Sequence, residues 1–253
     1  MTIKFSLIGA TGRVGRAFME TAEAAADFEL VGAMGLPEPD LPPIVWRGKR
    51  ITVTESPEEA VADAEVVIDF SRPEALRKII PVLQKKSIPL VTGTTGLGPD
   101  DLKIIETAAE KIAVVQEFNM SLGVNLLAHL VRRAAKIMGD DYDIDVQETH
   151  HRGKADAPSG TAIMLAKAGG GQKDESGKRT AMFPFGKVGV SSSRAGTVFG
   201  EHSVFFSGPD ERIELSHRAY SRAIFVRGAF LAARYLLDKP PGRYGMEQVL
   251  GID

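Results

Sequence analysis

Hydrophobic residues in the first half of the chain form short continuous runs separated by amphipathic stretches. The runs lie at 3–8, 28–34, 51–54, 65–70, 88–92 and 112–116. The longer stretches at 13–25, 73–86 and 99–111 have helical periodicity. Continuous apolar strands alternating with helices are typical of a parallel sheet covered on both faces. The pattern therefore predicts an α/β fold with a Rossmann-like domain over residues 1–121.

The second half has a different pattern. A long apolar stripe predicts a helix over 122–138, and residues 142–148 alternate as in a sheet with one solvated face. Three further strands, expected to be antiparallel, lie at 188–194, 202–207 and 212–217, and a helix follows at 221–237. We expect an α+β domain with a mixed sheet over 122–230, and a return of segment 231–253 to the first domain.

Composition excludes several classes of function. The 253 residues are 43% hydrophobic and 25% charged, which is sufficient for a large core. A net charge of −2 indicates neither a nucleic-acid nor a membrane partner. The absence of cysteine excludes disulfides and thiolate chemistry. With no secretion signal or apolar span in the sequence, we expect a cytoplasmic protein.

A glycine turn follows the first strand and opens the first helix. Gly9, Gly12 and Gly15 recur every three residues, a variant of the dinucleotide fingerprint in which the pyrophosphate lies on free N–H groups at a helix N-terminus. The alternative is a glycine-rich turn without a ligand. The residues expected to contact the dinucleotide here are Gly9, Ala10, Thr11, Gly12, Arg13 and Val14.

The second strand ends at Gly35, where dinucleotide folds usually carry an acid for the ribose hydroxyls. The nearest carboxylate is Glu38. Without an acid to repel a 2′-phosphate, and with Arg13 and Arg16 able to reach a phosphate, we expect NADPH or NADH as the cofactor, with a loose preference for NADPH.

Two later loops follow parallel strands, so they fall at the carboxyl edge where ligands bind. Ordinary βα turns are the alternative interpretation. The expected cofactor contacts in these loops are Gly93, Thr94, Thr95, Glu117, Phe118, Asn119 and Met120.

Residues 148–161 read Glu-Thr-His-His-Arg-Gly-Lys-Ala-Asp-Ala-Pro-Ser-Gly-Thr. His150, His151 and Lys154 are proton donors, and Ser159 is a good N-cap whose helix offers free N–H groups to a carboxylate. The segment predicts an enzyme that binds an acidic small molecule. No metal is expected, because Arg152 and Lys154 oppose a dication.

These motifs together resemble the 4-hydroxy-tetrahydrodipicolinate reductase (dihydrodipicolinate reductase) family. The resemblance rests on 9–15, 69–71, 93–96, 119–125 and above all 148–161, and segments 194–196, 200–202 and 244–246 also fit. It implies reduction of a cyclic dicarboxylate by NAD(P)H, in diaminopimelate and lysine biosynthesis, by a homotetramer assembled through the substrate-domain sheet. The catalytic residues would be His150 and Lys154. The substrate contacts would be His151, Ser159, Gly160, Thr161 and Thr95.

Two departures and two rival functions accompany the resemblance. Gly35 stands where the family has its acidic ribose ligand, and Glu117 and Phe118 replace small residues or proline. One rival is another two-domain NAD(P)-dependent dehydrogenase of imines or carbonyls. The other is a non-enzymatic sensor that binds NADP.

Overall fold

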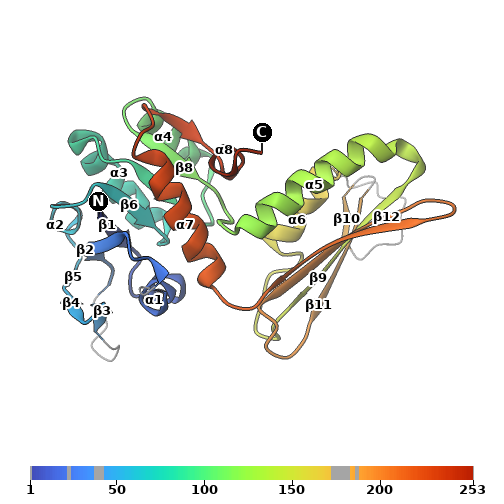
Figure 1. Cartoon of the computed structure of the whole chain (residues 1–253), viewed down its shortest axis with the longest axis horizontal. Helices are drawn as coiled ribbons and strands as arrows, with labels where there is room; N and C mark the ends of the chain where they lie inside the picture. Colours follow the sequence, from blue (N-terminus) through green and yellow to red (C-terminus); the bar gives the residue numbers. More distant parts are fainter. Residues whose placement is uncertain (1, 22–23, 37–42, 172–182, 186–187, 253) are drawn as a thin grey trace. The chain divides into compact units, whose positions relative to one another are not determined.

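The structure, a computed structural model, describes residues 2–21, 24–36, 43–171, 183–185 and 188–252 (Figure 1). The chain divides into two compact units, one comprising Met1–Met120 with Ala223–Gly251 and the other comprising Ser121–Arg222. The return to the first unit therefore falls at Ala223, and the sequence-based boundary at 231 lies inside a helix. Among the described residues, no helix has the length and apolar character needed to cross a membrane.

The first unit is built on a seven-stranded sheet in the order β14-β8-β7-β6-β1-β2-β5. Every pairing in it is parallel. The strands are β1 (Ile3–Ile8), β2 (Phe28–Met34), β5 (Val53–Thr54), β6 (Val66–Asp69), β7 (Leu90–Thr92), β8 (Ala113–Gln116) and β14 (Gly242–Tyr244). The predicted fold class is confirmed for this unit, although the edge strand β14 was not expected.

Helices cover both faces of this sheet. They are α1 (Arg13–Glu20), α2 (Pro57–Ala60), α3 (Pro73–Lys86), α4 (Pro99–Ala109), α7 (Ala223–Leu236) and α8 (Met246–Leu250). Alternate strand residues point to opposite faces, so the unit has two apolar layers. Phe18 of α1 and Phe230 of α7 belong to one layer, and Ile79 of α3 and Ile105 of α4 belong to the other. The expected helix over 13–25 was too long, because α1 ends at Glu20.

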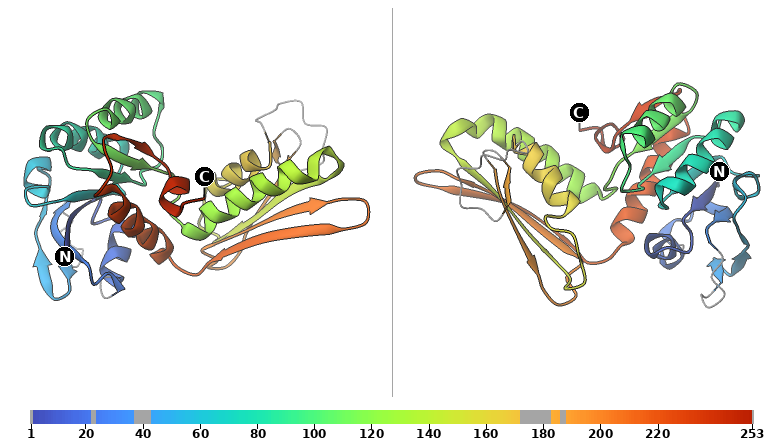
Figure 2. Two further views of the ribbon diagram at one scale, coloured as in Figure 1. Left: turned by 45° about the horizontal axis from the view of Figure 1, so that its top comes forward. Right: turned by 180° about the vertical axis from the view of Figure 1, so that it is seen from behind.

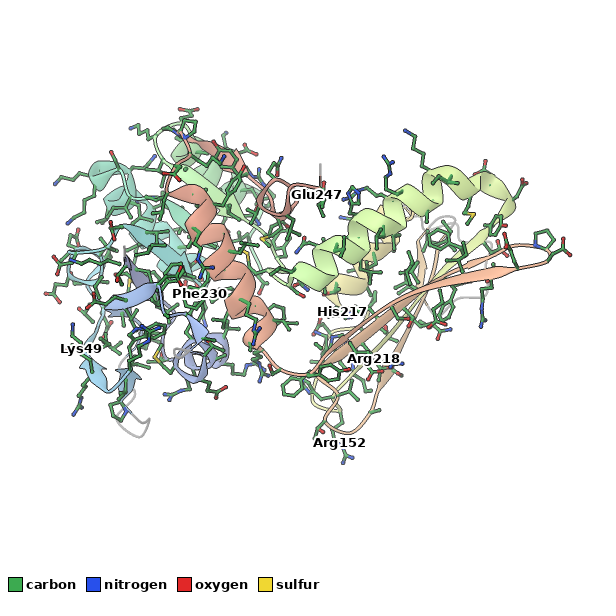
Figure 3. The ribbon with its side chains drawn as sticks, in the orientation of Figure 1. Lys49, Arg152, His217, Arg218, Phe230 and Glu247 are labelled. Carbon is green, nitrogen blue, oxygen red and sulfur yellow. The ribbon has the colours of Figure 1, made fainter. Side chains whose placement is uncertain are left out.

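An aromatic cluster attaches α7 to the sheet. Phe230, labelled in Figure 3, lies with its ring centroid 4.4 Å from that of Phe28, 5.2 Å from Phe18 and 5.5 Å from Phe5. Trp46 joins the same cluster from a hairpin of β3 (Ile44–Trp46) and β4 (Lys49–Ile51). The single strand expected over 51–54 was therefore wrong, since its first residue ends this hairpin and its last two form β5.

The second unit contains a five-stranded sheet in the order β10-β11-β9-β12-β13. Its strands are β9 (Asp143–His150), β10 (Phe183–Phe185), β11 (Val188–Arg194), β12 (Gly200–Ser207) and β13 (Arg212–Ala219). Figure 2 shows α5 (Leu122–Met138) and α6 (Gly160–Ala168) on one side of this sheet. The apolar residues of β9 and β12 that face these helices form the core of the unit.

The sheet is mixed, as expected, but one strand runs in an unexpected direction. β11 pairs with β9 in parallel, whereas the sequence predicted an antiparallel strand. The reason is the helix between them, because a β-strand, a helix and a second strand make a crossover that returns the chain in the same direction. The pairing aligns Arg194 with His150 at the carboxyl ends of both strands.

Candidate active site

The glycine turn of the first unit is shaped by close backbone contacts. A Cβ at Gly15 would lie 2.3 Å from the carbonyl oxygen of Gly9, and one at Gly9, where φ is +81°, would lie 2.5 Å from that of Phe70. Neither position accepts a side chain. Gly12 is the N-cap of α1 and makes no side-chain cap, so phosphate oxygens are suitable partners for the first N–H groups of this helix.

The other residues predicted around this turn differ in exposure. Ala10 is buried, so only its backbone is available to a ligand. Arg13 is exposed, and Thr11 and Val14 are half-buried. Gly35 lies beside the turn, because a Cβ there would come within 3.0 Å of the Thr11 hydroxyl oxygen. Glu38 lies outside the described residues.

A buried carboxylate ties two carboxyl-edge loops together. Asp69, at the end of β6, accepts hydrogen bonds from the Ser71 hydroxyl (2.5 Å) and from the hydroxyls of Thr92 and Thr94 (2.7 Å each). Burial raises the pKa of Asp69, and these hydrogen bonds oppose the rise. Because the Thr94 side chain is engaged in this way, a cofactor contact from Thr94 would come from its backbone, whereas Thr95 is exposed.

The next loops are also held by packing. A Cβ at Gly93 would lie 2.3 Å from the Phe70 ring. Glu117 accepts a hydrogen bond from the backbone N–H of Met246 at the start of α8 (3.3 Å). Met120 is fully buried in the core, while Phe118 is 57% exposed. Asn119 is half-buried beside them.

In the second unit, Glu148 and His150 lie two residues apart on β9 and point to the buried face. The Glu148 carboxylate, 2% exposed, is in hydrogen-bond contact with Nδ1 of His150 and also accepts the backbone N–H of Ser159 (3.2 Å). Burial would raise the pKa of Glu148, but the hydrogen bonds and positive charges around it prevail, and the pKa is lowered.

Arg194 completes this arrangement from the end of β11. Its two terminal nitrogens lie 3.1 Å from Oε1 of Glu148. The same guanidinium donates to the carbonyl oxygens of Lys154 (3.2 Å) and Asp156 (2.5 Å). One side chain therefore joins the Glu148 carboxylate to the backbone of the following loop.

Lys154 is held within this loop by Asp156. Its ammonium lies 2.7 and 2.8 Å from the two carboxylate oxygens, and its side chain is 21% exposed. The hydrogen bond from Lys154 lowers the pKa of Asp156. Arg194 thus connects Glu148, the partner of His150, to the backbone of the loop that carries Lys154.

The helix α6 begins where the sequence expected an N-cap. The Ser159 hydroxyl accepts the backbone N–H of Ala162 (3.1 Å) and contacts Nε2 of His202 (3.2 Å). Gly160 is exposed, and nothing lies within 4 Å of the position of a Cβ there. Thr161 follows and is half-buried.

His202 belongs to this cluster, although the sequence analysis gave it no role in the site. It is 4% exposed on β12, opposite Glu148 on one side and His217 on the other. Its ring lies 5.1 Å from that of His150. Burial, with a smaller contribution from the charge of the neighbouring His150, lowers the pKa of His202 to about 3.

His150 and His217 are also kept neutral. Burial is the main cause of the lowered pKa of each. For His150, the charges of Lys154 and Arg194 lower the pKa further, while Glu148 opposes them. His217 (Figure 3) packs beneath the start of α5, where a Cβ on Gly123 would lie 2.8 Å from its ring.

Glu148, His150 and His202 also form the one set of side chains in the described part of the chain with spacing suited to a metal ion. Both oxygens of Glu148 already accept hydrogen bonds from Arg194. Since a guanidinium carries a fixed positive charge and only donates, this environment disfavours a dication.

A cationic pocket opens beside the loop. It is lined by His151, Arg152, Gly153, Gly196, Thr197, Phe199 and Arg222, with no carboxylate among them. The Arg222 guanidinium lies 5.8 Å from the centre of the Phe199 ring. Arg222 was not selected from the sequence, because it lies more than sixty residues beyond the histidine segment in a polar turn. The pocket suits an anionic ligand.

Comparison with known proteins gives a consistent result across the chain. Two family models match, dihydrodipicolinate reductase N-terminus over residues 3–120 and dihydrodipicolinate reductase C-terminus over residues 123–250. A protein of Zymomonas mobilis named 4-hydroxy-tetrahydrodipicolinate reductase is 42% identical, covering 99% of this chain and 98% of its own. One of Anaplasma marginale with the same name is 40% identical, covering 98% and 99%.

Solved structures share the fold. A dipicolinate-bound dihydrodipicolinate reductase from Paenisporosarcina superposes with a TM-score of 0.78 at 21% identity, covering 97% of this chain and 98% of its own. An aspartate dehydrogenase from Thermotoga maritima superposes with a TM-score of 0.53 at 13% identity, covering 95% and 98%.

The family models, together with a parallel sheet that carries a glycine turn, identify a pyridine-nucleotide-dependent reductase. Within that class, the chain belongs to the dihydrodipicolinate reductase family, since both family models and full-length relatives agree. The family predicted from the sequence motifs is confirmed.

The lowered pKa of His202 predicts a pH-dependent stability. The folded-state pKa of about 3 lies below the ordinary value of 6.5, so between these values the unfolded chain binds a proton that the folded chain does not. The contribution is fully present above pH 6.5 and is lost as the pH falls. Its loss between pH 7 and pH 5 lowers the free energy of unfolding by about 2 kcal/mol, at ~1.4 kcal/mol per pH unit below 6.5.

Urea unfolding at both pH values measures this loss. Between pH 7 and pH 5, the free energy of unfolding of His202→Gln should fall by about 2 kcal/mol less than that of the wild type. The control His129→Gln changes a half-buried residue of α5 and should show the wild-type pH dependence. An identical pH dependence in His202→Gln and wild type contradicts the assignment.

Proposed function

We propose that the chain catalyses the NAD(P)H-dependent reduction of 4-hydroxy-tetrahydrodipicolinate to tetrahydrodipicolinate, a step of diaminopimelate and lysine biosynthesis. The observation that carries the proposal is the joining of His150, Glu148 and the Lys154 loop by Arg194, next to a cationic pocket, in a chain of this family. Such a site suits a dianionic substrate that needs a proton.

His150 is the proposed proton donor or acceptor. Its Nδ1 is occupied by Glu148, so its Nε2 is the nitrogen available to a substrate. Lys154 is the proposed second acid, which stabilises charge that develops during reduction. The nicotinamide, when bound, supplies the hydride, and the residues of this chain supply the proton and hold the carboxylates.

The carboxylates have two proposed anchors. His151 contacts one from the cationic pocket, together with Arg222. The other proposed anchor is the start of α6, where Gly160 and Thr161 follow the N-cap Ser159 and would hold a carboxylate; the N–H of Ser159 itself donates to Glu148. Thr95 is a further proposed contact.

The proposed nucleotide contacts lie at the glycine turn and the two carboxyl-edge loops. The exposed Arg13 and the lack of an acid at Gly35 favour NADPH, because a 2′-phosphate would meet a cation and no carboxylate. The contacts are Gly9, Ala10, Thr11, Gly12, Arg13, Val14, Gly35, Gly93, Thr94, Thr95, Glu117, Phe118, Asn119 and Met120.

We also propose a cytoplasmic homotetramer assembled through the sheet of the second unit. In this unit α5 and α6 lie on one side of the sheet. On the other side, β12 and β13 carry polar partners such as Ser203 and Ser216, whose hydroxyls are 2.7 Å apart. Light scattering should give four times the 27.2 kDa mass of the chain. A monomeric mass at micromolar concentration contradicts the assembly.

Removal of either proton donor should slow catalysis. His150→Gln and Lys154→Ala should each lower kcat by about 10²–10⁴-fold, the usual contribution of a positioned acid or base. The assay follows NADPH oxidation with freshly generated dihydrodipicolinate, which also separates this function from another dehydrogenase or a sensor. His129→Gln and Lys136→Ala on α5 are the matched controls. Unchanged kcat in both site variants removes these residues from the chemistry.

Cofactor preference should depend on Gly35. The wild type should bind NADPH at least as tightly as NADH, and Gly35→Asp should shift the ratio of the dissociation constants toward NADH by about tenfold, or ~1.4 kcal/mol. The new carboxylate would repel the 2′-phosphate and accept the ribose hydroxyls. Titration of nucleotide fluorescence measures both constants, with Gly48→Asp in the hairpin turn as control. Binding of NADH more than tenfold tighter than NADPH in the wild type contradicts the assignment.

A further inference from the structure

The buried Glu148 carboxylate has more partners than an ordinary surface acid. Its Oε1 accepts from the backbone N–H of Ser159 and from both terminal nitrogens of Arg194, and its Oε2 accepts from Arg194 and contacts Nδ1 of His150. Carboxylate oxygens that are ionised only accept hydrogen bonds. The nitrogen Nδ1 of His150 must therefore carry a hydrogen.

This arrangement defines the other ring nitrogen. In a neutral imidazole only one nitrogen carries hydrogen, so Nε2 of His150 is the acceptor. Nε2 has no hydrogen-bond partner within the described part of the chain and lies beside Gly200, where a Cβ would come within 2.9 Å of it. Glycine at that position avoids this contact.

Arg194 carries the arrangement into the following loop. The guanidinium that bonds Glu148 also bonds the carbonyl oxygens of Lys154 and Asp156. Since its five donors lie in a rigid plane, the carboxylate and the two carbonyls are fixed relative to one another. Arg194 therefore contributes to the position of Lys154 relative to His150, together with the backbone hydrogen bond from Lys154 to the carbonyl oxygen of His151 (3.1 Å).

We propose that Glu148 and Arg194 are positioning residues of the reduction, with Glu148 selecting the Nδ1–H tautomer of His150. Arg194 keeps Glu148 oriented and holds the Lys154 loop against it. The inference rests on the proposed function, in which His150 exchanges the proton. It adds that Nε2 is the nitrogen that does so.

Glu148→Gln tests the tautomer directly. Because Arg194 only donates, the amide oxygen of this variant has to face Arg194, and its NH₂ group then faces Nδ1 of His150. The hydrogen of the imidazole should move to Nε2. Nitrogen-15 NMR of the full-length protein distinguishes the two tautomers, and the His150 signal is assigned by its loss in His150→Gln.

The expected results form a consistent set. The wild type shows the Nδ1–H tautomer, and Glu148→Gln shows Nε2–H with kcat lowered about 10²-fold and the KM for dihydrodipicolinate within about threefold, since misplacing the proton affects the chemical step more than binding. Glu55→Gln, at an exposed position of the first unit, retains the wild-type signal and kcat.

The pH profile adds a readout that loss of packing alone does not move. His150 is faced by Glu148 on its own strand, by Arg194 from β11, by His202 from β12 and by Lys154 from the loop. Of these, Glu148 is the partner that raises the pKa of His150. The kcat limb that belongs to His150 should therefore shift to lower pH in Glu148→Gln.

Arg194→Lys separates the two positioning roles. An ammonium retains the charge beside Glu148 but lacks the planar fork that reaches both carbonyls. The Nδ1–H tautomer should persist while kcat falls about tenfold because the Lys154 loop is released. A wild-type kcat in this variant overturns the role assigned to Arg194.

Two results overturn the role assigned to Glu148. One is an Nε2–H tautomer in the wild type, and the other is an Nδ1–H tautomer with wild-type kcat in Glu148→Gln. The wild-type tautomer is read without substrate, and His150→Gln is needed only to assign the signal. If the chain reduces some other imine, the assay with dihydrodipicolinate shows no activity, and the NMR measurement still decides which nitrogen of His150 carries the hydrogen.

Discussion

A carboxylate buried in a sheet has to be satisfied by donors, and this requirement organises the second unit. Glu148 is almost inaccessible to water, so leaving its charge without partners would cost several kcal/mol. Its partners come from three separate segments: the last residue of its own strand, the end of β11 and the N-terminus of α6. The requirement to satisfy one acid thus brings together the residues that the proposed chemistry needs.

The first unit also has a buried carboxylate that accepts hydrogen bonds from neighbouring segments, at the carboxyl edge of its sheet. Asp69 is also buried, and its four hydrogen bonds connect the loops after β6 and β7. The glycine turn adds a steric constraint, because Gly9 and Gly15 permit backbone approaches that no side chain allows. Both features keep the backbone amides of these loops in place, which is what a nucleotide bound mainly through backbone groups requires.

Local signals explain why much of the fold was predictable. Helix α3 was expected over 73–86 and begins at Pro73, which suits a first helical position, while α5 lies between the cap Ser121 and Gly139. Elements fixed by distant partners were missed. β14 pairs with β8 from more than 120 residues away, and the β3–β4 turn uses Arg47 at φ +45°, without the usual Asn-Gly signal. The candidate site segment 148–161 could be identified from its composition. The roles of Arg194 and His202 depend on strand register, which no local pattern specifies.

Because β9 and β11 pair directly, the position of Arg194 beside His150 does not depend on the length of the chain that connects the two strands. Arg194 is placed beside His150 by ladder hydrogen bonds that run from Val188 onward, and α6 has already crossed the sheet before Gly169. Residues gained or lost between α6 and β11 would leave the guanidinium where it is, because the pairing of β11 with β9 sets its position. Homologues of this enzyme are therefore free to vary there in length without altering their chemistry.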